Sequence, residues 1–147
     1  MSDAALEGLY AAPIRDHARQ PRHRARLECA DATARGDNPL CGDRVEVFLA
    51  LEGGRIARAS FLGRGCDVSQ ASADLMAGAL PGLDAAGARA LSAQVQRMAR
   101  SGEAGGVPEG LAALAAAARF PSRVKCATLP WVTLEAALDG AREASSE

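Results

Sequence analysis

Residues 44–62 decide the fold, and they read RVEVFLAL, EGG and RIARASFL. Polar and apolar side chains alternate in residues 44–51 and again in residues 55–62, as they do in strands that bury one face. Gly53 and Gly54 lie between the two runs, where a tight reversal of the chain needs backbone freedom. The stretch therefore predicts an antiparallel β-hairpin.

Helical patterns lie on both sides of this hairpin. Helices are expected at about residues 4–18, despite Pro13, and at about 71–80, 84–100 and 108–119. Pro130 is expected in the first turn of a closing helix, which would leave Cys126 just upstream of a helix start. A short strand is expected at 25–30, a loop at 31–39 and a glycine-containing junction at 101–107. The predicted fold class is α+β, a small antiparallel sheet of about three strands packed against several helices.

Length and charge narrow the function classes. The 147 residues are expected to form a single domain over residues 1–147, with frayed ends at about 1–4 and 141–147. The 17 basic and 18 acidic residues give a net charge of −1, which disfavours nucleic acid and anionic membranes as partners. No apolar run approaches the roughly 20 residues that span a bilayer, and the first residues lack a signal-peptide pattern. We therefore expect a cytoplasmic protein.

Three cysteines stand in separate and distinctive frames. They are NPLCGD at residues 38–43, GRGCDVS at 63–69 and RVKC at 123–126. In a reducing compartment, four cysteines rarely form a disulfide framework, so metal binding or catalysis is favoured. A thiolate is both a soft metal ligand and a nucleophile. Cys41, Cys66 and Cys126, with Asp43, can therefore supply tetrahedral Cys3Asp coordination.

The frame of Cys66 predicts a reactive or ligating thiol. Gly63 and Gly65 end the second strand of the hairpin, and a helix is expected to begin within a few residues of Cys66. Asp67 and Ser69 are both candidate caps of that helix. The positive end of the helix dipole favours a thiolate over a thiol.

Other polar residues are assigned more ordinary roles. Cys29 lies in the strand expected at 25–30 and is interpreted as a buried core residue. His17 and His23 are not expected to be ligands. Lys125 is either a solvated charge or a cation that lowers the pKa of Cys126 and stabilises a bound persulfide, and both interpretations stay open. Arg123 is either a second supporting cation or a surface charge. An alternative interpretation is that Cys41, Cys66 and Cys126 are small hydrophobic residues buried in the core. The glycine and aspartate residues next to them disfavour this interpretation.

The three cysteine frames together resemble the U-type iron-sulfur assembly proteins, the NifU/IscU/SufU family. The opening segment, with Leu9-Tyr10, Asp16-His17 and Gln20-Pro21-Arg22, is also similar to that family. The resemblance covers nearly the whole chain in order, and it implies an IscU/SufU-like α+β fold. It also implies that Cys41, Asp43, Cys66 and Cys126 form the metal site.

Two features resemble the SufU branch of that family more than the IscU branch. Lys125 occupies the position where the IscU branch has a histidine ligand, and a charged lysine does not bind metal. In addition, 60 positions separate Cys66 from Cys126, with an extra helical segment around 84–106. The resemblance therefore implies a Zn2+-dependent sulfurtransferase that accepts sulfur from a SufS-like cysteine desulfurase and passes it to downstream iron-sulfur assembly proteins.

Cys41 is the expected sulfur acceptor, because it lies in a turn where Gly42 permits unusual backbone angles and the loop can move. The main alternative is a scaffold on which a transient [2Fe-2S] cluster is assembled and handed on. A further alternative is a non-catalytic binding module that zinc stabilises.

Overall fold

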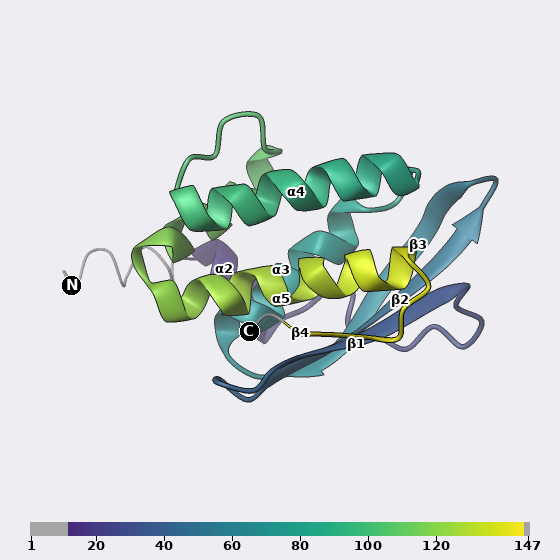
Figure 1. Cartoon of the computed structure of the whole chain (residues 1–147), viewed down its shortest axis with the longest axis horizontal. Coiled ribbons are helices and arrows are strands. Elements are labelled where there is room, and N and C mark those ends of the chain that lie inside the picture. Colours follow the sequence, from purple (N-terminus) through teal and green to yellow (C-terminus); the bar gives the residue numbers. More distant parts are fainter. Residues whose placement is uncertain (1–11, 146–147) are drawn as a thin grey trace.

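The computed structural model describes residues 12–145. Its elements follow the chain in this order: α2 (Ala12–Arg19), β1 (Ala32–Asn38), β2 (Asp43–Glu52), β3 (Arg55–Arg64), α3 (Asp67–Ala79), α4 (Ala85–Ser101), the 3-10 helix η1 (Glu109–Arg119), α5 (Pro121–Leu138) and β4 (Glu143–Ser145). The four strands form one sheet in the order β3-β2-β1-β4. Helices α3 and α5 pack against the sheet, and α4 lies outside them against α5 and η1 (Figure 1). The predicted α+β class is confirmed.

The predicted hairpin is present as β2 and β3. The two strands pair antiparallel, with Val47 opposite Phe61 and Leu49 opposite Ala59. These four side chains are buried and point to the helical side of the sheet, so the alternation in the sequence marks the core-facing positions. The register shifts between Ala50 and Leu51, close to the turn.

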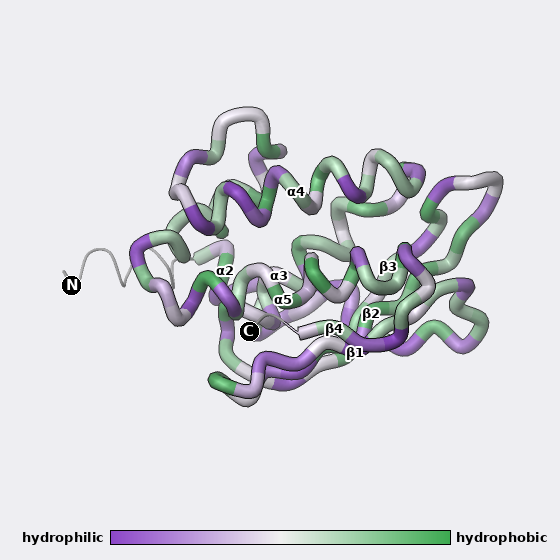
Figure 2. The backbone as a smooth tube through the Cα atoms, viewed as in Figure 1, coloured by the Kyte–Doolittle hydropathy of each residue, from purple (hydrophilic) through white to green (hydrophobic). Residues whose placement is uncertain are grey.

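The helices bury side chains according to their place in the layers. Nearly every residue of α3 from Val68 to Ala77 is buried, because this helix lies between the sheet and the other helices. Figure 2 shows hydrophilic and hydrophobic segments alternating along α4, the outer helix. The buried residues of α4 recur at helical spacing, and they are Ala88, Leu91, Ser92, Val95, Met98 and Ala99.

Trp131 anchors α5 in the core. Its side chain is fully buried, and its Nε1 donates a hydrogen bond of 3.1 Å to Ser72 Oγ on α3. The Ser72 hydroxyl in turn donates to the carbonyl of Ala127 at 2.6 Å. The two central helices are therefore joined by a polar contact in which each buried donor has a partner.

Strand β1 corrects the prediction for residues 25–39. The expected strand at 25–30 is instead an irregular segment with a turn at 28–29, and the expected loop at 31–39 contains the seven residues of β1. Gly36 suggested a loop, but here it marks a close approach of α5. A Cβ at Gly36 would collide with Thr133 Oγ1 and lie 3.2 Å from Thr133 Cβ. Glycine is used at this position because the Thr133 and Leu129 side chains of α5 fill the space that a side chain would need.

The expected frayed tail is also partly wrong. Glu143–Ser145 forms β4, which pairs parallel with β1, and Arg35 N donates to the carbonyl of Arg142 at 2.8 Å. The sheet is therefore mixed, with three antiparallel strands and one short parallel strand. The remaining residues of the expected tail, 146–147, and those of the expected frayed start lie outside the described part.

Helix α5 begins nine residues earlier than predicted, at Pro121, which occupies its first turn. Pro130 lies inside this helix rather than at its start. Proline has no N–H, so the carbonyl of Cys126, four residues earlier, receives no helical hydrogen bond from it. Cys126 consequently lies in the second turn of α5, and the prediction that it precedes a helix is wrong.

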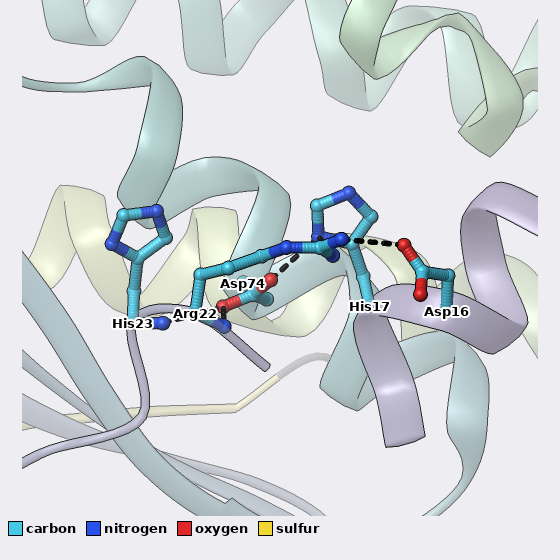
Figure 3. A network of polar contacts seen from close by, with 5 residues as sticks. All are labelled: Asp16, His17, Arg22, His23 and Asp74. Atoms are coloured by element: carbon cyan, nitrogen blue, oxygen red, sulfur yellow. Dashed lines mark hydrogen bonds and ion pairs between the residues drawn. The ribbon is translucent and has the colours of Figure 1, made fainter. Parts of the chain in front are cut away.

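Helix α2 is held to α3 by the buried carboxylate of Asp74 (Figure 3). One oxygen of Asp74 accepts from the backbone N–H groups of Arg22 and His23, both at 2.8 Å. The other oxygen lies 2.5 Å from His17 Nδ1. Arg22 also pairs with Asp16 across the turn that follows α2. Of the helix expected at 4–18, residues 4–11 lie outside the described part.

Candidate metal centre

Three separate segments meet at one end of the sheet. Cys41 and Asp43 come from the β1–β2 turn and the start of β2, and Cys126 comes from α5. One ligand atom from each of these residues lies within 4.8 Å of the other two. Cys66, at the start of α3, places its sulfur 3.9 Å from Asp43 Oδ2. The structure thus brings together the four residues that the sequence singled out.

The β1–β2 turn exposes Cys41. The carbonyl of Asn38 closes this turn by accepting from the N–H groups of Cys41 at 3.2 Å and Gly42 at 2.9 Å. Gly42 has a φ of +70°, a conformation that favours glycine. Cys41 is exposed, and the neighbouring Leu40 has 72% of its surface accessible. Among Cys41, Cys66 and Cys126, the Cys41 thiol is therefore the one most open to a partner protein.

Asp43 is buried and held in place by the start of α3. Its Oδ1 accepts from the backbone N–H of Cys66 at 2.9 Å. Gly65 makes this approach feasible, because a Cβ there would collide with the Asp43 carboxylate and lie 2.9 Å from its Cα. Gly65 also has a φ of +142°. From the sequence, Gly65 is predicted only to end the strand, and its position directly before Cys66 is the one local sign of this contact.

The predicted helix start near Cys66 is present, because Cys66 is the N-cap residue of α3. No side chain accepts a capping hydrogen bond at this end of the helix. Ser69 Oγ donates instead to the Cys66 carbonyl at 3.1 Å, so the prediction of Asp67 or Ser69 as a cap is wrong. A hydrogen bond from the Cys126 thiol, together with the N–H groups of Ser69 and Val68, lowers the pKa of Cys66 to about 6. Between Cys66 and Cys126, Cys66 is thus the thiol that ionises first.

Cys126 is fully buried, and its thiol donates to the Ser122 carbonyl at 3.6 Å. The hydrogen bond to Cys66, reinforced by burial, raises the pKa of Cys126 well above its ordinary range. Cys41 Sγ also lies 4.0 Å from the Ser122 carbonyl, so one backbone oxygen faces two thiols.

The remaining polar residues lie around or away from this centre. Lys125 and Arg123 precede Cys126 on α5 and are both half-buried.

Cys29 is exposed in the turn at 28–29, so its assignment to the core is wrong, because the expected strand that would have buried it is absent. His17 Nδ1 and the backbone N–H of His23 both contact the Asp74 carboxylate. Asn38, which stands within the NPLCGD frame, was given no role from the sequence, and its side-chain Nδ2 lies 4.0 Å from Cys126 Sγ.

The donor set fits a zinc ion. Thiolate sulfur and carboxylate oxygen are both zinc ligands, and donors that share one tetrahedral zinc lie about 3.3 to 3.8 Å apart. The ligand atoms of Cys41, Asp43 and Cys126 lie within 4.8 Å of one another, and Cys66 Sγ lies 3.9 Å from Asp43 Oδ2, so the four donors are close to that spacing. The chemistry and spacing define an α+β protein with a cluster of cysteine and aspartate side chains at one end of its sheet that could hold a metal ion.

Comparison with known proteins identifies the family. Residues 9–127 match the NifU-like N terminal domain. The zinc-dependent sulfurtransferase SufU of Bacillus subtilis (strain 168) is 36% identical over 135 residues, which cover 90% of this chain and 91% of SufU. The iron-sulfur cluster assembly scaffold protein IscU of Streptococcus pyogenes serotype M1 is 34% identical over 140 residues, covering 94% and 87% of the two chains. This chain belongs to the NifU-like N-terminal domain family.

A solved structure supports the same assignment. It is a candidate iron-sulfur cluster assembly scaffold protein for the SUF system from Fervidobacterium islandicum AW-1. It superposes with a TM-score of 0.76 at 28% sequence identity, covering 90% of this chain and 98% of that one. The predicted NifU/IscU/SufU resemblance and the predicted fold are therefore confirmed.

Proposed function

We propose that this protein is a zinc-dependent sulfurtransferase of iron-sulfur cluster biogenesis. The observation that carries the proposal is the convergence of Cys41, Asp43 and Cys126 within 4.8 Å, with Cys66 beside Asp43. When bound at these four residues, zinc would hold the sulfurs as thiolates and tie the three segments together. The similarity to SufU over 90% of the chain supports the same assignment.

Cys41 is the proposed sulfur acceptor. Its thiolate attacks the terminal sulfur of a persulfide on a cysteine desulfurase, and a new sulfur–sulfur bond forms on Cys41. The sulfur–sulfur bond of the donor breaks, and the donor cysteine leaves as a thiolate. A downstream acceptor thiolate then attacks the terminal sulfur on Cys41 in the same way. The exposure of Cys41 supports this role, because Cys126 is fully buried.

Lys125 and Arg123 are assigned supporting roles. Both lie within three residues of Cys126 on α5, where positive charge favours the anionic sulfur of a persulfide or thiolate. The site of action is expected to be the cytosol, where thiols stay reduced. None of the helices in the described residues is long and apolar enough to cross a bilayer.

The test is anaerobic native mass spectrometry after incubation with cysteine and a cysteine desulfurase. We expect the protein to keep one zinc and gain sulfur on Cys41, and the Cys41→Ala variant to gain none. Cys29→Ala is the matched control, because Cys29 is also an exposed cysteine but lies outside the site. Sulfur uptake by the Cys41→Ala variant at the rate of the unmodified protein would refute the acceptor assignment.

A scaffold role is the second candidate, and the 34% identity to the IscU relative favours it almost as strongly as the 36% identity to SufU. Adding iron to the same incubation separates the two. Exchange of zinc for iron and sulfide, with visible absorption, would support assembly of a [2Fe-2S] cluster. A purely structural zinc module would bind the desulfurase without accelerating alanine production.

A further inference from the structure

Asn38 is a buried amide at the edge of the proposed metal site. It is the last residue of β1 and pairs in register with Asp43, so it closes the turn that carries Cys41. Its side chain is fully buried. Its backbone carbonyl already accepts from Cys41 and Gly42, so the position of this residue determines the path of the turn.

The side chain of Asn38 points its donor at the third cysteine. Asn38 Nδ2 lies 4.0 Å from Cys126 Sγ, across 88 positions of sequence. Asn38 Oδ1 has no hydrogen-bond partner among the described residues. A buried amide that leaves one polar atom unpaired is unfavourable for folding alone, so its presence needs another explanation.

The chemistry of Cys126 supplies that explanation. In the metal-free protein, the Cys126 thiol donates to the Ser122 carbonyl. A metal-bound sulfur has lost its proton, so it accepts hydrogen bonds and gains nothing from a carbonyl. Asn38 Nδ2 is a donor already directed at this sulfur, and outer-shell donors of this kind orient metal ligands.

We propose that Asn38 is a positioning residue that holds the Cys126 sulfur toward the Cys41–Asp43 turn and so determines how tightly the site retains its metal. This inference rests on the proposed metal site and adds a residue to it. Asn38 links the turn to α5 through two contacts. Its backbone carbonyl accepts hydrogen bonds from the N–H groups of Cys41 and Gly42 in the turn, and its side-chain amide faces the Cys126 sulfur on α5.

The test replaces zinc by cobalt(II), whose thiolate charge-transfer absorption grows with the number of bound sulfurs. Asn38→Leu keeps a similar volume and removes the amide. We expect about tenfold weaker cobalt binding or more, and a charge-transfer intensity reduced by about one third, because one of three sulfurs is displaced. The unfolding midpoint of the metal-free variant should stay near that of the unmodified protein, because leucine removes the unpartnered Oδ1 and loses only the 4.0 Å contact of Nδ2 with Cys126 Sγ.

Thr133→Val is the matched control. Thr133 is a fully buried polar residue on the same helix, it packs against the same strand at Gly36, and valine keeps its shape. This variant should bind cobalt with unchanged affinity and intensity. Equal affinity and intensity in Asn38→Leu and the unmodified protein would overturn the positioning role.

Two further outcomes are also decisive. If Asn38→Leu does not fold, Asn38→Asp keeps the shape and replaces the donor by an acceptor, and full charge-transfer intensity in this variant overturns the proposal. If the unmodified protein shows no thiolate–cobalt absorption, the metal site of the proposed function is wrong, and the role of Asn38 is overturned together with it.

Discussion

Gly65 is the residue on which the position of the Asp43 carboxylate depends. Gly65→Ala would place a methyl group against Asp43 at a backbone angle that favours glycine, so we expect a loss of about 2 to 4 kcal/mol in the free energy of unfolding. Urea denaturation of the metal-free protein measures this loss. Gly82→Ala is the control, because Gly82 has a φ of +93° but no atom within 4 Å of its added Cβ. Equal losses in both variants would contradict the steric explanation.

Cys66 should make the stability of the metal-free protein depend on pH. Its pKa falls from an ordinary value of 9.0 to about 6 in the folded state, so between these values the unfolded chain binds more protons than the folded one. The contribution of Cys66 is therefore fully present above about pH 9 and is lost as the pH falls through 6. We expect the free energy of unfolding to rise with pH across this window.

Urea melts under reducing conditions at several pH values measure this rise. The raised pKa of Cys126 acts in the opposite sense, since its contribution is present below the ordinary thiol pKa and is lost only at higher pH. Cys66→Ser should flatten the slope between pH 6 and 9, whereas Cys29→Ser should leave it unchanged. An unchanged slope in Cys66→Ser would show that another group titrates.

At the scale of elements, the attachment of α2 to α3 depends on Asp74. The Asp74 carboxylate is fully buried. Asp74→Ala removes the acceptor of the backbone N–H groups of Arg22 and His23, and it also removes the partner of the His17 side chain. We expect a loss of about 3 kcal/mol in the free energy of unfolding. Asp74→Asn should lose less, because its amide oxygen can still accept from both N–H groups.

Thermal unfolding followed by circular dichroism measures both Asp74 variants. Asp16→Ala is the control from the same network, because its ion pair with Arg22 lies on the surface, where such pairs contribute little. A loss in Asp16→Ala equal to that in Asp74→Ala would mean that the surface pair, and not the buried carboxylate, holds α2 in place.

At the scale of the whole molecule, a metal bound by the proposed ligands would connect the β1–β2 turn, the start of α3 and α5. Binding to the folded state alone adds about 4 kcal/mol when free metal exceeds its dissociation constant by about 1,000-fold. For a chain of this size we expect chelation to lower the unfolding midpoint by roughly 10 °C. Trp131, the only tryptophan, is buried on α5 and reports the transition by fluorescence.

The control for chelation is Cys126→Ser, which lacks one proposed ligand. Its unfolding midpoint should hardly change when a chelator is added, because it has little metal to lose. A chelator effect of the same size in Cys126→Ser and in the unmodified protein would place the stabilising metal elsewhere.

The sequence alone determined the features whose causes are local. The β2–β3 hairpin follows from alternation and a glycine turn, and the start of α3 follows from the glycines before Cys66. The four proposed ligands were identified because each cysteine has a distinctive neighbourhood of a few residues. These patterns depend only on residues that are close together in the sequence, so they can be recognised without knowledge of the tertiary structure.

Only the tertiary structure decided the features that depend on distant partners. β1 is a strand because β2 pairs with it and α5 packs over Gly36, although its own residues suggest a loop. β4 exists because β1 offers it a parallel edge. Cys29 is exposed because no strand forms around it, and Asn38 gains its role from Cys126, 88 positions away. Pairing, burial and contacts of this kind arise only when segments meet, so no local pattern could predict them.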